Sequence, residues 1–387
     1  AETIDILKEL GVVYTDVTIY AYNQPLEVNS FHRPDGLGER VQELLLRACV
    51  NAGVDIFTST PAKKLLTDDK GAVIGVQAID SKGNTMNIGA KAVILATGGF
   101  GNNPDMVKKY SWIYRNAYNT YQCVPTENTG DGINMALEIG ADTENIGALM
   151  IISCARGKTL NSHVNGAGAQ PVLWVNKTGR RFISEEVAMS FADAGNNVAK
   201  QPDGVVYAII DAATVKHLME EGSDIGLGDF IPYKQKLTRL QAELDQDVAD
   251  GVAWKADTIE DLAKQIGLDP AVLAKTVADY NDACDKGYDP EFFKPAKYLR
   301  PVRTVPFYAI NMAPSVLVSC GGIRVNGNLQ VTDKDYKPIP GLYAVGMDAS
   351  GLYGDTYNLD CPGTANGFAH TSGRVAARHA IKYIKGQ

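Results

Sequence analysis

The stretch Lys91-Ala-Val-Ile-Leu-Ala-Thr-Gly-Gly-Phe-Gly101 decides the fold of this chain. Residues 92–96 form an unbroken apolar run, which is typical of a strand buried on both faces of a sheet. Thr97-Gly98-Gly99 follows directly, and glycine permits positive φ and close approach of the backbone to another group. Because open α/β sheets bind ligands at the carboxyl ends of their strands, the stretch predicts a ligand-binding strand. Taken alone, it also fits an ordinary buried strand that ends in a glycine turn.

Composition and charge narrow the class of protein. The 387 residues exceed what one compact core usually spans, so we expect two domains. A net charge of −8 argues against a nucleic-acid partner. No apolar run approaches the roughly 18 residues of a membrane-spanning helix, so we expect no transmembrane segment. The cysteines are far apart and form no Cys-x-x-Cys, so we expect no metal site.

The first part of the chain alternates between helix and strand patterns. Apolar spacing predicts helices over 2–10 and 39–52 and a short strand at 54–57. Short β patterns at 62–66, 73–79 and 85–88, separated by turn residues, predict a three-stranded meander. Asn128-Thr-Gly-Asp-Gly132 precedes a helical pattern, so it predicts either a polar ligand at a helix N-terminus or an ordinary N-cap.

Glycine and polar runs replace this alternation between about 145 and 305, which we interpret as one inserted domain. The patterns predict a hairpin over 171–183, a strand at 205–210, and helices at 212–220, 258–265 and 269–286. Buried-strand patterns return at 307–312, 323–326 and 341–346, and Thr364 opens a long final helix. Gly373 lies inside that helix, where we expect close packing against a sheet.

Six segments, in order, together resemble the flavoprotein family of fumarate reductases, urocanate reductases and 3-ketosteroid dehydrogenases. They are Ala92-Val-Ile-Leu-Ala-Thr-Gly-Gly-Phe100, Thr129-Gly-Asp-Gly132, Val175-Asn-Lys-Thr-Gly-Arg-Arg-Phe182, Gly321-Gly322, Pro340-Gly-Leu-Tyr-Ala-Val-Gly346 and the helix opening from Gly363 to Arg374. The resemblance covers nearly the whole chain. It implies an α/β (α+β) fold, in which a doubly wound FAD-binding domain (residues 1–144 and 306–387) is interrupted by an α+β capping domain (residues 145–305).

The resemblance also implies which residues bind FAD. The expected cofactor-binding residues are Ala96, Thr97, Gly98, Gly99, Gly130, Asp131, Gly132, Gly346, Asp348, Gly363, Thr364, Ala365 and Asn366. Asp348 is expected near the ribityl chain, and the amides of residues 364–366 near the flavin ring. The family's N-terminal Gly-x-Gly-x-x-Gly unit is absent, which implies an FAD-binding domain that is incomplete at its N-terminus. We expect the complete chain to supply that missing N-terminal segment.

The family's dicarboxylate-binding residues are also replaced. Met189 stands where the fumarate reductases carry their general-acid arginine, so fumarate is not the expected substrate. Tyr353 takes the place of a substrate-side histidine, and Tyr357 follows it; a phenol can donate a proton, although both tyrosines also fit simple loop packing. Arg156 is a third catalytic candidate, with a solvated surface arginine as the alternative.

These features predict an FAD-dependent oxidoreductase acting on CH–CH groups. We expect hydride transfer between flavin and the activated C=C bond of a small, unsaturated, non-dicarboxylate substrate that is enone-like, steroid-like or an aryl acrylate. Reduction is the expected direction, with an unidentified electron donor; a dehydrogenase working in the oxidative direction and an inactive or flavin-free fragment are the alternatives. The bacterial cytoplasm and the cell envelope both remain open as compartments.

Overall fold

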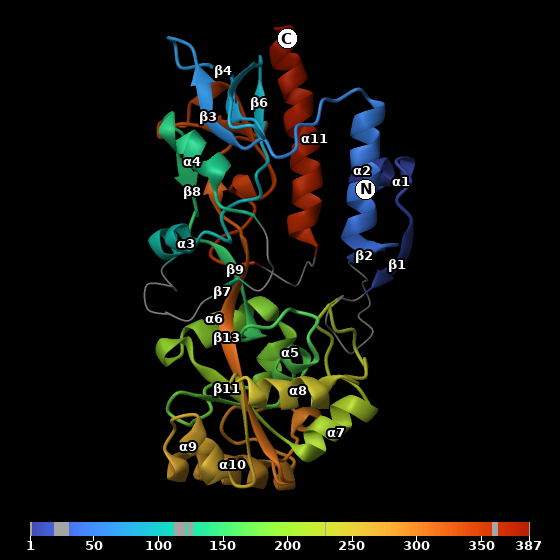
Figure 1. The fold of residues 1–387 in the computed structure, drawn as a ribbon, viewed down its shortest axis with the longest axis vertical. Helices are drawn as coiled ribbons and strands as arrows, with labels where there is room; N and C mark the ends of the chain where they lie inside the picture. Colours follow the sequence, from blue (N-terminus) through green and yellow to red (C-terminus); the bar gives the residue numbers. More distant parts are fainter. Residues whose placement is uncertain are drawn as a thin grey trace.

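The computed structural model describes residues 2–18, 31–111, 121–122, 127–228, 230–357 and 363–386. The molecule is elongated, and both described ends of the chain lie in its upper part, while α7 to α10 lie in its lower part (Figure 1). The long strand β13 (Phe307–Ser319) runs between these two parts. Mixed helix and sheet confirm the predicted fold class.

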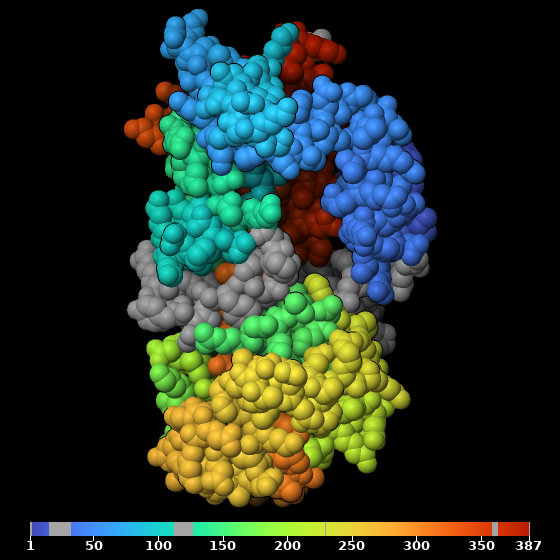
Figure 2. Space-filling model, in the orientation of Figure 1, coloured from blue at the N-terminus to red at the C-terminus, as the bar shows by residue number. Residues whose placement is uncertain are grey.

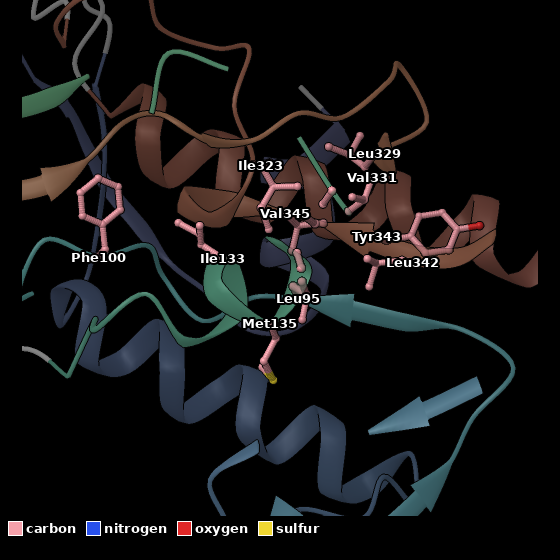
Figure 3. Packing of buried hydrophobic residues seen from close by; sticks show 14 of the residues in the cluster. Leu95, Phe100, Ile133, Met135, Ile323, Leu329, Val331, Leu342, Tyr343 and Val345 are labelled. Atoms are coloured by element: carbon pink, nitrogen blue, oxygen red, sulfur yellow. The ribbon is translucent and has the colours of Figure 1, made fainter. Parts of the chain in front are cut away.

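The upper part is built around a three-stranded sheet in the order β15-β16-β6. Strand β6 (Val93–Leu95) runs parallel to β16 (Pro338–Ala344), which pairs antiparallel with β15 (Gln330–Thr332). Helices α4 (Asp131–Glu138) and α11 (Thr364–Lys385) contribute to the same apolar core. Figure 3 shows Leu95, Met135 and Val345 meeting in this core.

Strand β6 differs from the prediction in one respect. Its residues are not buried on both faces, because Ile94 is 38% exposed while Leu95 is 4% exposed. Within the described ranges β6 pairs with β16 alone, so it forms an edge of this sheet. The strand predicted at 54–57 is also wrong: Val54, Ile56 and Phe57 have no strand structure and are all exposed. An apolar run becomes a strand only where a neighbouring strand accepts its hydrogen bonds.

The predicted meander is confirmed. It comprises β3 (Ala62–Thr67), β4 (Val73–Ile79) and β5 (Thr85–Gly89), paired antiparallel in that order. Asp68 fixes the first turn by accepting hydrogen bonds from the backbone N–H groups of Lys70 and Ala72, each at 2.9 Å. These are the short side-chain-to-backbone bonds that make aspartate a turn residue.

The N-terminal elements form a separate layer beside α11 (Figure 1). They are α1 (Glu2–Glu9), β1 (Tyr14–Thr18), β2 (Phe31–Pro34) and α2 (Leu37–Asn51). Contact with α11 runs through side chains: Glu2 pairs with Arg374 at 2.6 Å and also with Arg378. The helices predicted at 2–10 and 39–52 are therefore confirmed within a few residues.

The lower part contains a six-stranded sheet with β13 at its centre. Strands β10 (Leu173–Asn176), β11 (Val206–Asp211) and β12 (Ala253–Ala256) belong to its outer half, and β7 (Tyr121–Gln122) and β9 (Leu149–Ala155) pair with the other half of β13. Short strands β8 (Thr143–Glu144) and β14 (Gly322–Ile323) pair nearby. The domain boundaries at 144/145 and 305/306 stay a prediction.

Helices cover this sheet and close the lower part (Figure 1). They are α5 (His163–Gly168), α6 (Phe191–Ala199), α7 (Ala212–Glu220), α8 (Leu240–Ala249), α9 (Ile259–Gln265) and α10 (Pro270–Lys286), with α3 (Pro104–Tyr110) in the upper part. Thr258 caps α9 and Asp269 caps α10 through side-chain oxygens, as the sequence predicts.

Two other predictions need correction. The hairpin over 171–183 is wrong, because β10 pairs with β11 and residues 180–183 form no strand. Gly373 does not mark close packing either, since a Cβ added there would meet no atom within 4 Å. No helix in the described ranges is both long enough and apolar enough to cross a membrane.

Candidate functional site

The Thr97-Gly98-Gly99 loop at the end of β6 is tied to Asp348, which lies just after β16. The Asp348 carboxylate accepts hydrogen bonds from the Thr97 N–H (2.5 Å), the Thr97 hydroxyl (2.9 Å) and the Gly99 N–H (2.9 Å). Asp348 is fully buried, and burial raises its carboxyl pKa against the opposing effect of these donors. The loop is therefore held by a side chain that lies 249 residues beyond Gly99 in the sequence.

The glycines of this loop are needed for packing within the chain. Gly98 and Gly99 have φ of 83° and 81°, in the left-handed region. A Cβ on Gly98 would lie 2.5 Å from the amide nitrogen of Asn128, and one on Gly99 would lie 2.0 Å from the hydroxyl oxygen of Ser319. The Ser319 hydroxyl in turn accepts a hydrogen bond from the Phe100 N–H at 3.0 Å. The sequence singled out the segment that begins at Asn128 but not its contact with Gly98, and no local spacing identifies Ser319 as a partner of this loop.

The residues Gly130, Asp131 and Gly132 lie beside this loop. Gly130 caps α4 in the left-handed conformation, and the Gly132 N–H donates to the Thr97 hydroxyl at 3.1 Å. Asp131 is exposed and accepts a hydrogen bond from the Thr129 hydroxyl at 3.1 Å. The structure thus brings together three segments that the sequence singled out separately, around residues 97, 131 and 348.

An open hollow lies between α11 and the N-terminal elements. Figure 2 shows it as a deep gap with α11 at its back. Its volume is about 330 Å³, and its lining includes Gly363, Asn366, Gly367 and His370 at the start of α11. The opposite wall is formed by α1, β1, β2 and α2, with Tyr14 and Val41 among the lining residues. The N-terminus of α11 therefore faces open space large enough for a sizeable ligand.

Tyr353 and Tyr357 form a pair at the other side of the α11 N-terminus. Their ring centroids lie 4.9 Å apart, and both side chains are buried. The Tyr353 hydroxyl hydrogen-bonds the Thr364 hydroxyl at 2.7 Å, and burial raises the pKa of Tyr353. Thr364 and Ala365 are thus joined to the tyrosines, while Gly363 and Asn366 line the hollow.

The surroundings of this tyrosine pair are apolar. The two rings share a cluster with Ile152, Leu160 and Cys320, and Phe191 from α6 packs against it. The side chain of Asn196 on α6 donates a hydrogen bond to the Thr356 hydroxyl at 3.0 Å. This contact links α6 directly to the segment that carries both tyrosines.

Arg156 and Met189 both lie in the region between residues 145 and 305. Arg156 is exposed at the end of β9, its backbone N–H donates to the Asn311 carbonyl, and its charge acts on Tyr207 of β11. Met189 packs against the core of the capping region, and its sulfur accepts a long hydrogen bond from the Tyr298 hydroxyl at 3.5 Å. Met189 is therefore a packing residue. Its correspondence to the family's general-acid arginine and a catalytic role for Arg156 both stay predictions.

A buried ion cluster supports the segment that carries Met189. Arg181 makes paired hydrogen bonds to Glu185 (2.9 and 2.8 Å) and to Asp289 (3.0 and 2.8 Å). The ammonium of Lys294 lies 3.3 Å from the Glu185 carboxylate. Glu185 begins the short 3-10 helix η2 (Glu185–Met189), so the cluster fixes this helix against the core. The spacing of Arg181 and Glu185 is a local signal that could have predicted the first of these pairs.

A known protein family and two known proteins match most of this chain. Residues 26–361 match the family described as the FAD binding domain. Vinyl phenol reductase from Lactiplantibacillus plantarum is 36% identical over 402 residues, covering 100% of this chain and 79% of that protein. Urocanate reductase from Eggerthella lenta is 34% identical over 334 residues, covering 84% of this chain and 50% of that protein.

This chain belongs to the FAD binding domain family. The family resemblance seen in the sequence and FAD as the cofactor are therefore confirmed. Among solved structures, the open conformation of a flavocytochrome c3 fumarate reductase matches with a TM-score of 0.74 at 30% identity, covering 99% of this chain and 62% of that chain. The chain thus spans between half and four-fifths of the length of these relatives.

The hollow in front of α11 fits the ring end of FAD. The first amides of this 22-residue helix have no intrahelical acceptor, and their partial positive charge favours a negatively charged ligand. A Cβ on Gly367 would meet no atom within 4 Å, so the helix face is open there. Residues 363–366 would hold the cofactor, whereas the Thr97 and Gly99 amides already bond to Asp348. Roles for residues 96–99, 130–132, 346, 348 and 363–366 toward FAD stay predictions.

Proposed function

We propose that this chain forms the substrate-binding and flavin-facing part of an FAD-dependent reductase that acts on the C=C bond of an apolar aryl alkene. The observation that carries the proposal is the buried Tyr353–Tyr357 pair, bonded to Thr364 at the N-terminus of α11. Relatives named for vinyl phenol, urocanate and acrylate support alkene reduction as the reaction class. The name of the vinyl phenol reductase supports an aromatic substrate.

The apolar surroundings of the tyrosines argue against a dicarboxylate. Binding of two carboxylates needs cationic partners with paired donors. Here Met189 replaces one expected arginine and packs into the capping core. Leu317 and Val318 also pack against the tyrosine cluster. We therefore propose that the substrate is not a dicarboxylate. After an aryl alkene, an enone or a steroid is the second candidate substrate.

Tyr353 is the proposed proton donor. When bound and reduced, FAD supplies the hydride for one alkene carbon. A phenol is protonated at neutral pH, so the Tyr353 hydroxyl can donate its proton to the other carbon and recover one from solvent. The Thr364 hydroxyl orients the phenol, and the Tyr357 ring closes one side of it. The apolar side chains around the pair exclude water from the reacting carbon.

A substrate panel tests this proposal. The flavin-loaded protein, reduced with an excess of viologen dye, is offered 4-vinylphenol, a cinnamate, a cyclic enone and fumarate, and oxidation of the dye is followed. We expect turnover of the apolar alkenes and a loss of at least about 100-fold in kcat for Tyr353→Phe. Tyr357→Phe is the matched control, with a smaller loss. Efficient reduction of fumarate, or full activity of Tyr353→Phe, would contradict the proposal.

We also propose that further polypeptide packs against the open edge of β6. The edge of β6 is open at Ile94, and Val54, Ile56 and Phe57 are exposed, so this part of the chain leaves apolar surface uncovered among the described residues. Exposed apolar surface of this kind marks a site of association. The expected N-terminal segment of the complete chain is the proposed occupant. Without it, this chain is the flavin-free fragment considered as the alternative.

Flavin content distinguishes these states. We expect the product of the complete gene to purify with bound flavin and the 387-residue chain to bind added FAD weakly. The measurement is the flavin absorbance spectrum together with a thermal melt with and without FAD, because a ligand that binds only the folded state raises the melting temperature. Tight binding of FAD by the 387-residue chain would show that no further segment is needed.

A further inference from the structure

A narrow apolar pocket lies inside the capping region. It is lined by residues of β9, β10, α5 and α6, among them Ser153, Leu160, Trp174 and Phe191. Phe230 lies at the pocket and is 39% exposed. As seen here, the pocket has room for little more than a water molecule, so a larger ligand requires a phenylalanine ring to turn aside.

The polar groups of this pocket are satisfied within the protein, with one exception. The Trp174 indole N–H donates to the Gly168 carbonyl at 3.0 Å. The Asn165 side chain accepts from the Ala155 N–H at 2.9 Å and donates to the Leu160 carbonyl at 3.1 Å. The Ser153 hydroxyl oxygen, by contrast, is buried and has no hydrogen-bond partner among the described residues. A buried hydroxyl without a partner is unfavourable, which points to a partner that binds from outside the chain.

The pocket adjoins the proposed reaction site. Leu160 lines the pocket and also belongs to the apolar cluster of Tyr353 and Tyr357. Phe191 packs against that cluster and against the capping core that contains Trp174. Leu160 and Phe191 are therefore shared by the pocket and the tyrosine cluster. A molecule with a ring in the pocket and a short arm past Phe191 would direct that arm toward the tyrosines.

We propose that this pocket binds the aromatic ring of the substrate and that the Ser153 hydroxyl hydrogen-bonds a hydroxyl group on that ring. The proposal rests on the reductase function proposed above and narrows its substrate to a phenol with a short unsaturated arm. Apolar walls and a single polar contact are the features that select such a ring over a charged one. Ser153 is then the residue that distinguishes a phenol from the corresponding benzene.

Binding of saturated compounds tests the pocket separately from catalysis. We measure equilibrium binding of 4-ethylphenol and of ethylbenzene to the protein by titration calorimetry. Ser153→Ala is expected to weaken the binding of 4-ethylphenol about tenfold, the effect of one lost hydrogen bond. The binding of ethylbenzene should stay unchanged. Ser184→Ala is the matched control, because its hydroxyl is also buried without a partner but does not line the pocket.

Urea unfolding of the variants gives a second readout. Neither serine substitution should lower stability, since neither removes a hydrogen bond within the chain. Equal weakening of both ligands, unchanged binding of 4-ethylphenol, or destabilisation by Ser153→Ala alone would overturn the proposal. If 4-vinylphenol is reduced but Ser153→Ala changes neither its KM nor the binding of 4-ethylphenol, the proposed role of the pocket is wrong and the proposed reductase function stands. If no alkene is reduced but Ser153→Ala selectively weakens the binding of 4-ethylphenol, the proposed reductase function is wrong and the proposed pocket stands.

Discussion

Replacing Asp289 by Asn is expected to destabilise the capping region by about 3–5 kcal/mol, the usual cost of removing one partner of a buried ion pair. The Asp289 carboxylate is 1% exposed and accepts two hydrogen bonds from Arg181. Arg181, Lys294, Glu185 and Asp289 together carry two positive and two negative charges. The substitution keeps the shape of the side chain but leaves one buried positive charge without a partner.

The pKa of Asp289 gives a second measure of the same interaction. Burial raises this pKa, but the hydrogen bonds and charge of Arg181 outweigh burial and lower it from 3.8 to about 2. At about 1.36 kcal/mol per pH unit, the difference corresponds to roughly 2 kcal/mol, somewhat less than the cost of deleting the charge. Because the folded-state pKa is lowered, this stability is present above pH 3.8 and is lost as the pH falls toward 2.

Urea unfolding followed by tryptophan fluorescence measures the effect, since Trp174 is buried and its backbone N–H donates to the Glu185 carboxylate. Asp282→Asn is the control: its exposed pair with Lys286 on α10 is expected to contribute less than about 0.5 kcal/mol. Adding Lys294→Met to Asp289→Asn restores neutrality and should recover at least about 1 kcal/mol. A cost no larger than that of Asp282→Asn, or a double variant with additive losses, would refute the reasoning.

Three further predictions concern the upper part and its contact with the capping region. Asp348→Asn is expected to speed hydrogen exchange at the Thr97 and Gly99 amides by about tenfold or more, because both N–H groups bond to its carboxylate; unchanged exchange by mass spectrometry would contradict this. Asn196→Ala removes the hydrogen bond to Thr356, so kcat for alkene reduction should fall about three- to tenfold while the melting temperature stays nearly constant; a change in melting temperature alone would indicate a purely structural contact. Gly373→Ala should stabilise the 387-residue chain by about 1 kcal/mol, because a Cβ there meets no atom within 4 Å; a lower urea midpoint would show that this face is covered.

Local patterns predicted much of the fold. The meander at 62–89 and the caps at Thr258 and Asp269 are confirmed because turn and cap chemistry depends on residues only a few positions apart. The same holds for the long helix that begins at Thr364. Predictions failed where a segment needed a distant partner. Residues 54–57 have the composition of a strand but no neighbouring strand in the described chain. Residues 180–183 do not form a strand with β10, and Arg181 pairs with Glu185 in the buried ion cluster instead.

The sequence by itself determined the family and the cofactor, because glycine-containing segments around residues 98, 130, 346 and 363 recur in a fixed order. It also identified Tyr353 and Tyr357 as chemical candidates. Only the tertiary structure placed these two tyrosines against Thr364, bound Asp348 to the Thr97–Gly99 loop, and left the Ser153 hydroxyl unpaired among the described residues. The physical reason is that hydrogen-bond satisfaction in a folded chain depends on which buried groups meet, and those groups here come from segments up to about 250 residues apart.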